Sequence, residues 1–191
     1  MDRWLSRRLA EHGIIKGEEQ EIYCFGIRNG MILLLNFMTA LFIGIFTGKL
    51  TVVIVFTTAF MLLRGYTGGY HADSRFVCYI GSTLVVLFPV FAEKMLCRIV
   101  LQQRYTLLFL AFGIILLFSP MDSKKRKLDE TERRHFGLRA WFVAFMEMLA
   151  YDILWQTEQI PYAYAVYMAV CITAILMIAG KIQLWRQFHT E

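Results

Sequence analysis

The sequence has 191 residues, of which 58% are hydrophobic and only 18% are charged. Soluble domains are about 45–50% apolar and about 25% charged, so this composition excludes an ordinary soluble protein and indicates an integral membrane protein. The four cysteines are scattered singly, without a C-x-x-C pair, which excludes a disulfide framework and a zinc site. We expect no metal, no cofactor and no nucleic-acid partner.

Apolar runs, free of charge in all but the fifth, mark the expected membrane spans in chain order. They cover residues 30–48, 50–63, 76–92, 105–121, 140–157 and 159–180. The pattern predicts one all-α polytopic membrane domain over residues 1–191, with six spans. Four spans plus two re-entrant or interfacial segments also fit. Residues 1–28 mix apolar and basic positions, so a short helix in the cytoplasmic interface is expected there.

The second span is too short to cross a bilayer unaided. Residues 50–63 reach only about 21 Å at a rise of about 1.5 Å each, against a hydrocarbon thickness of about 30 Å. Either Lys49 reaches the interface with its long side chain, or the helix continues past Arg64 toward the following glycines. In the second case protein must cover the irregular backbone, because such backbone cannot face lipid.

Lys and Arg residues predict the orientation. With six spans, sixteen of them fall on one side of the membrane and four on the other. The positive-inside rule therefore predicts cytoplasmic termini and cytoplasmic segments at residues 64–75 and 121–139. The second segment belongs to SPMDSKKRKLDETERRHFGLR, the strongest charge run. Its charges direct insertion and attract anionic lipid, or they dock an acidic partner.

The fifth predicted span contains two acidic residues, Glu147 and Asp152. Carboxylates are costly inside a membrane, so this segment is either buried against other helices or only partly inserted. The two side chains are candidates for function or for pairing with Arg64.

Residues 64–78, RGYTGGYHADSRFVC, gather polar and flexible residues where a span should end. A cysteine nucleophile needs a base within hydrogen-bond reach. On one continuous helix His71 and Cys78 would stand about 10.5 Å apart along the axis, too far to exchange a proton. If the two residues cooperate, the chain must therefore break between them.

The sequence supplies that break. Gly68 and Gly69 permit a tight bend, and Asp73 or Ser74 can cap a new helix that carries the cysteine in or near its first turn. The helix N-terminus and a protonated histidine would then both favour the thiolate. The plainer alternative is a histidine that faces headgroups and a cysteine that only packs. A metal site at this position would lack a fourth ligand.

The string R-G-Y-T-G-G-Y-H-A-x5-C resembles the accessory gene regulator B family, membrane cysteine endopeptidases that process the precursors of bacterial autoinducing peptides. The histidine and cysteine separated by six residues, the preceding Gly-Gly and the arginine seven residues before the histidine carry this resemblance. The later string S-P-M-D-S-K-K-R-K-L, residues 119–128, is similar to the family's proline-containing junction into a basic cytoplasmic loop.

The resemblance implies roles for individual residues. Cys78 would be the nucleophile and His71 its base, while Arg64 and Gly69 stand at positions that the family needs for activity. Gly68 and Asp73 would support them. The family's substrates carry an acidic C-terminal tail, and the basic residues on the matching side of the membrane are Lys124, Lys125, Arg126, Lys127, Arg133 and Arg134.

These observations lead to one functional hypothesis and two rivals. The hypothesis is a cysteine endopeptidase of the bacterial cell membrane that cleaves a quorum-sensing pro-peptide through a thioester and promotes cyclisation to a thiolactone or lactone. The resemblance also suggests a homodimer. The rivals are a small peptide transporter or exporter, and a non-enzymatic membrane scaffold. Polar residues gathered at one edge, instead of spread through several spans, count against a transporter.

Overall fold

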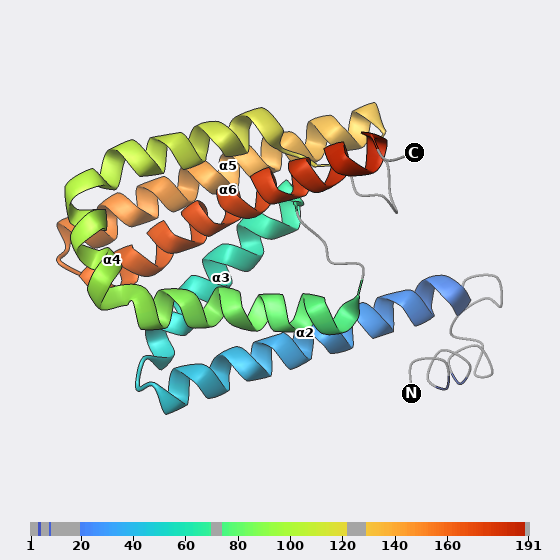
Figure 1. Cartoon of the computed structure of the whole chain (residues 1–191), viewed down its shortest axis with the longest axis horizontal. Coiled ribbons are helices and arrows are strands. Elements are labelled where there is room, and N and C mark those ends of the chain that lie inside the picture. The colour runs from blue at the N-terminus through green and yellow to red at the C-terminus, as the bar shows by residue number, and fades with distance from the viewer. Residues whose placement is uncertain (1–3, 5–7, 9–19, 70–73, 122–128, 190–191) are drawn as a thin grey trace. The chain divides into compact units, whose positions relative to one another are not determined.

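The computed structural model describes residues 4, 8, 20–69, 74–121 and 129–189, and Figure 1 labels its helices α2 to α6. By their contacts the residues divide into two units, Met1–Thr39 and Ala40–Glu191. Most of α2, Gln20–Phe46, belongs to the first unit. The second unit contains α3 to α6 and the candidate site. The interfacial helix expected within residues 1–28 lies mostly outside the described residues.

Helix α3, Leu50–Thr67, continues one turn past Arg64. Its eighteen residues reach about 27 Å, which removes most of the shortfall expected from the apolar run alone. The helix ends where Gly68 takes a φ of +70°, a region that glycine enters without the steric cost of a Cβ. The prediction that the helix continues past Arg64 is confirmed.

Helix α4, Arg75–Phe118, joins the third and fourth predicted spans in one helical element with a kink at Gln103, where φ is −115° and ψ is 19°. The charged residues around 94–104 predict a loop between the spans, and this prediction is wrong. The segment contains no glycine or proline, and its Met, Leu, Arg, Lys and Gln residues favour helix. The charged residues in this segment end the apolar run, but they do not end the helix.

Helix α5, Glu130–Gln156, starts inside the segment expected to be the basic loop. Asp129 caps it: its carboxylate accepts from the Glu130 backbone N–H at 2.8 Å, and its own N–H donates to Glu132 Oε2 at 3.4 Å. Residues 130–139 of the predicted 121–139 loop are therefore helical.

Helix α6, Ile160–His189, runs back beside α5 after a short turn in which Glu158 has a φ of 60° (Figure 1). It packs against α3, α4 and α5. Residues 163–170 of α6 are all buried, and the alanines among them allow close helix contact. The hydrophobic core of the second unit is therefore centred on α6.

The ends of α3 to α6 gather at two places (Figure 1). At one end lie the starts of α3 and α6, the end of α5 and the α4 kink. There the Lys49 ammonium pairs with Glu93 and donates to the Val90 carbonyl at 3.0 Å, so Lys49 is not simply extended toward lipid headgroups. At the opposite end lie the ends of α3, α4 and α6 and the start of α5, while the start of α4 stands apart from them on the same side of the picture (Figure 1). This second end contains the motif residues.

Apolar side chains cover much of the outside of the second unit. Phe91 is 73% exposed and Leu117 79% exposed, which a soluble protein rarely tolerates over a wide area. In the described residues, Leu50–Thr67, Phe76–Glu93 and Ile160–Arg186 are long and apolar enough to cross a membrane. The all-helical membrane architecture is confirmed to this extent. Six spans and cytoplasmic termini stay predictions.

Candidate active site

The turn after α3 is built around Arg64. Its Nη1 donates a hydrogen bond to the Gly68 carbonyl, which closes the turn over the end of the helix. Gly69 follows with a φ of +126°. A Cβ at Gly69 would overlap Arg64 Nη1 and lie 3.3 Å from the Leu176 carbonyl oxygen of α6. The turn therefore requires glycine at 69 both for backbone conformation and for space.

The segment after α4, Ser119–Met121, folds onto this turn. The Met121 N–H donates to the Thr67 carbonyl at 2.9 Å, which satisfies one of the last acceptors of α3. A Cβ at Gly68 would come within 2.9 Å of the Met121 carbonyl oxygen. The two strings that carry the family resemblance, 64–78 and 119–128, are thus in direct contact through Met121, although residues 79–118 separate them in the sequence.

Pro120 extends the same contact to α5. A Cβ at Gly137 would lie 3.3 Å from Pro120 Cδ, so the small residue lets the helix approach the proline ring. Gly137 begins the inward stripe of α5, which continues with Ala140 and Ala144. The turn, the Ser119–Met121 segment and the first part of α5 therefore form one packed unit.

Cys78 lies at the start of α4. Ser74 occupies the N-cap position, and the Cys78 N–H donates to its carbonyl at 3.0 Å as the first bond of the helix. The predicted helix start is confirmed, but the Ser74 hydroxyl makes no capping hydrogen bond. The backbone N–H groups of residues 75–77 precede that first bond, so they form the positive end of the helix dipole. The Cys78 thiol is half-buried and free.

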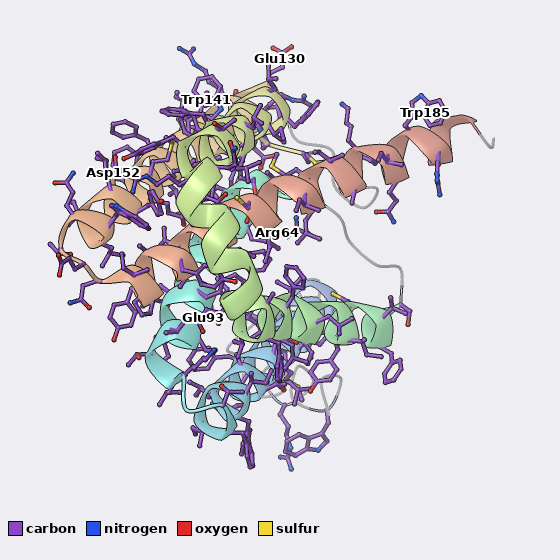
Figure 2. The ribbon with its side chains drawn as sticks, turned by 60° about the vertical axis from the view of Figure 1, so that its left-hand side comes forward. Arg64, Glu93, Glu130, Trp141, Asp152 and Trp185 are labelled. Carbon is purple, nitrogen blue, oxygen red and sulfur yellow. The ribbon has the colours of Figure 1, made fainter. Side chains whose placement is uncertain are left out.

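Arg64 connects the turn with this helix start. A thiolate at Cys78 interacts electrostatically with the Arg64 guanidinium. Figure 2 marks Arg64 beside α6, at the end of the bundle where α3 finishes. Arg64 is half-buried, so water screens its charge only in part.

Several predicted site residues lie outside the described residues: His71, Asp73, Lys124, Lys125, Arg126 and Lys127. The residues that flank them do belong to the structure. Gly69 and Ser74 flank the first group, while Met121 and Asp129 flank the second. The pairing of His71 with Cys78 stays a prediction.

The basic residues of the expected 121–139 loop that the structure describes are helical and exposed. Arg133 and Arg134 occupy the first turns of α5. Arg133 also lines a pocket that includes Lys181 of α6. Sequence reasoning missed Lys181, because nothing in its local pattern shows that α6 ends beside the start of α5. No group of three or more metal-ligating side chains occurs among the described residues.

The two acidic residues of α5 do not pair with Arg64. Asp152 accepts a hydrogen bond from the Tyr105 hydroxyl at 3.4 Å, at the end of the bundle opposite Arg64 (Figure 2). Glu147 is 7% exposed, and neither of its carboxyl oxygens has a hydrogen-bond partner among the described residues. The interpretation of either residue as a partner of Arg64 is wrong. The helix register keeps both of them away from the end of α3.

Comparisons of the sequence with known proteins identify the family of this chain. The model of one protein family, described as accessory gene regulator B, matches residues 3–178. The accessory gene regulator protein B of Staphylococcus carnosus (strain TM300) is 32% identical over 88 residues, which are 45% of this chain and 44% of that protein. The match thus spans less than half the length of this curated relative. No solved structure matches the chain. The chain belongs to the accessory gene regulator B family.

Proposed function

We propose that this protein is a cysteine endopeptidase of the bacterial cell membrane, with Cys78 as nucleophile and His71 as base. One observation supports this proposal most strongly. Arg64, held in place by the Gly68 carbonyl, interacts electrostatically with a thiolate at Cys78, which itself lies at the positive end of α4. A positive charge and a helix N-terminus are the surroundings in which reactive cysteines of enzymes are typically found.

The first step is attack of the Cys78 thiolate on a peptide carbonyl of the precursor. The carbonyl carbon becomes tetrahedral and its oxygen becomes an anion. Collapse then breaks the C–N bond, and His71 gives the leaving amine its proton. The product is a thioester between Cys78 and the N-terminal part of the precursor.

The second step closes a ring. A cysteine or serine inside the bound peptide attacks the thioester carbonyl, and the Cys78 sulfur leaves and is reprotonated. The product is a thiolactone or a lactone. Water at the same carbonyl would give a linear acid instead, so a site at the membrane edge that excludes water favours cyclisation.

The start of α4 offers donors for the oxyanion. The Ser74 side chain does not cap the helix, which leaves backbone N–H groups of residues 75–77 without that partner. Such groups stabilise negative charge that develops in a transition state. These N–H groups lie in the helical turn that leads to Cys78, whose own N–H donates to the Ser74 carbonyl at the same helix end. We assign the oxyanion to this helix terminus.

The substrate proposed is a small pro-peptide with an acidic C-terminal tail, handled at the cytoplasmic face by a homodimer. Basic residues at the Arg64 end would attract that tail. Arg134 is exposed in the first turns of α5, directly after the segment that contains Lys124–Lys127. Opposite charge steers such a partner at low ionic strength.

The direct test is co-expression with a cognate precursor and observation of its cleavage. Cys78→Ala and His71→Ala should abolish cleavage and leave the protein in the membrane. Cys171→Ala is the matched control, because this free thiol lies in α6 and interacts with the Tyr167 hydroxyl. Intact cleavage by either of the first two variants rejects the assignment.

A peptide exporter is the second candidate, and buried polar atoms support it. Thr57, Glu147 and Thr173 contribute such atoms to α3, α5 and α6, with no hydrogen-bond partner among the described residues. Transporters place polar groups in this way inside several helices. Proteoliposomes separate the two activities. An exporter moves a mature peptide across the membrane whether or not Cys78 is present, whereas the peptidase produces a cleaved precursor and no transport.

A further inference from the structure

A pocket of about 180 Å³ is lined in part by the Ser119–Met121 segment. It is lined by Leu117, Phe118, Ser119, Pro120, Met121, Arg133, Lys181 and Leu184. Two of these residues carry positive charge, and no acidic side chain of the described residues lines it. The cations come from different helices, Arg133 from α5 and Lys181 from α6. This pattern favours an anionic ligand.

One cation of the pocket, Lys181, is held beside an aromatic ring. The Lys181 ammonium stands 5.8 Å from the centre of the Phe118 ring, a contact that holds the charge at the pocket without neutralising it. The Ser119 hydroxyl has no hydrogen-bond partner among the described residues, although it is buried. The oxygen of this hydroxyl is inaccessible to solvent, so recognition of an anion rests on Arg133 and Lys181.

The apolar walls indicate which anion enters. Leu117 is 79% exposed at the end of α4, on the surface where other apolar side chains face outward. Trp185, 61% exposed, follows Lys181 by one turn of α6 and is labelled near the end of that helix in Figure 2. Tryptophan together with basic residues at the end of a span is typical of the headgroup level of a membrane. The pocket therefore joins the apolar surface to a cationic site at that level.

We propose that this pocket binds the phosphate of an anionic phospholipid. The phosphate lies between Arg133 and Lys181, and an acyl chain follows Leu117 and Leu184 along the outside of the helices. Anionic lipid is the occupant that fits both halves of the pocket, because a free phosphate leaves the apolar walls uncovered. A peptide carboxylate in the same place also leaves the apolar walls uncovered.

The bound lipid would also stabilise the turn. Met121 contacts Thr67 and Gly68, and the Ser119–Met121 segment to which it belongs also lines the pocket. An occupant of the pocket thus holds the segment against the turn that carries Arg64. Lipid binding itself needs no peptidase activity, so its test is independent of the role of Cys78.

The experiment uses the purified full chain in detergent and titrates it with phosphatidylglycerol or phosphatidylcholine, with retained lipid counted by native mass spectrometry. Phosphatidylglycerol should bind more tightly. Lys181→Gln and Arg133→Gln should each weaken its binding about fivefold, as expected for one basic residue near an anionic surface. Arg139→Gln, an exposed α5 cation outside the pocket, is the matched control and should change nothing.

Three results would overturn the proposal. The first is equal binding of both lipids. The second is unchanged phosphatidylglycerol binding in both Lys181→Gln and Arg133→Gln, provided that Lys181→Glu, a stronger change of charge, also leaves the binding unchanged. The third is a variant effect limited to inorganic phosphate or to the acidic precursor peptide, each titrated in a parallel series. A free anion or the substrate would then be the occupant of the pocket.

Discussion

The guanidinium of Arg64 occupies the space that a side chain at residue 69 would need. A Cβ on Gly69 would overlap Arg64 Nη1, and the φ of +126° at this residue disfavours any L side chain. The arginine and the glycine therefore form one structural unit. The sequence resemblance implies that both are needed for activity, and the geometry supplies a physical reason for each.

Gly69→Ala should impair precursor cleavage by at least about tenfold, which corresponds to about 1.4 kcal/mol of lost transition-state stabilisation. The added methyl displaces Arg64 from the Gly68 carbonyl, and the backbone strain costs about 1–3 kcal/mol of stability. Cleavage assays and thermal unfolding in detergent measure the two effects.

The matched control is Gly65→Ala. Gly65 is exposed in α3 and nothing lies within 4 Å of the position of an added Cβ. Alanine should therefore stabilise the helix by up to about 1 kcal/mol and leave cleavage unchanged. Equal cleavage rates of Gly69→Ala and Gly65→Ala would show that the position of Arg64 does not depend on the absence of a side chain at residue 69.

Arg64 can be tested through the reactivity of the Cys78 thiol. Arg64→Gln should slow alkylation of Cys78 at neutral pH by about three- to tenfold, because removal of one nearby charge changes the free energy of the thiolate by on the order of 1 kcal/mol. Arg64→Lys keeps the charge and should retain most of the rate. Mass spectrometry of the labelled cysteines follows the reaction.

Cys171 serves as the internal reference in this measurement, since it lies in α6 and shares no described contact with Arg64. If Arg64→Gln slows labelling of both thiols equally, the substitution has disturbed the fold. If it changes neither, the electrostatic link between Arg64 and Cys78 is absent.

Local sequence signals predicted the elements that frame the site. The missing length of the second span predicted either a reaching Lys49 or a helix that continues past Arg64, and α3 does continue. Asp73 or Ser74 was expected to cap α4, and Ser74 holds the N-cap position. Helix limits depend on neighbouring residues, such as glycine after a helix and a cap before one, so they can be read along the chain.

Long-range contacts could not be predicted in this way. The contact of Met121 with Gly68 and the position of Lys181 beside Arg133 depend on how α4, α5 and α6 pack, and no local pattern encodes that packing. The helix through residues 94–102 was missed for another reason. Charge was interpreted as the end of a helix, although helix-forming residues continue through it.

The basic segment should bind the acidic part of a precursor. Neutralisation of Lys124–Lys127 to glutamine is expected to weaken precursor binding, more strongly at low salt than at high salt, since a Debye length of about 10 Å at 0.1 M screens exposed charges. Binding of a labelled precursor to membranes at several salt concentrations measures this effect. A C-terminal topology reporter is the control. A change in topology alone would assign these charges to insertion.

Glu147 offers a test of stability inside the bundle. Its two carboxyl oxygens are buried in α5 without a hydrogen-bond partner among the described residues, and a buried unpaired polar group costs about 1–3 kcal/mol. Glu147→Leu should therefore raise the free energy of unfolding by a similar amount. Unfolding of the purified protein by a denaturing detergent gives this free energy.

Glu147→Gln is the matched variant, because it keeps the size and the polarity of the side chain. It should give a much smaller gain than leucine, since its amide is equally unpaired. A loss of stability in Glu147→Leu would show that the carboxyl group has a partner in the membrane-embedded protein. A stabilised Glu147→Leu protein that no longer cleaves its precursor would instead show that the cost of burying this carboxyl group is retained for function, as is typical of ionisable residues inside membranes.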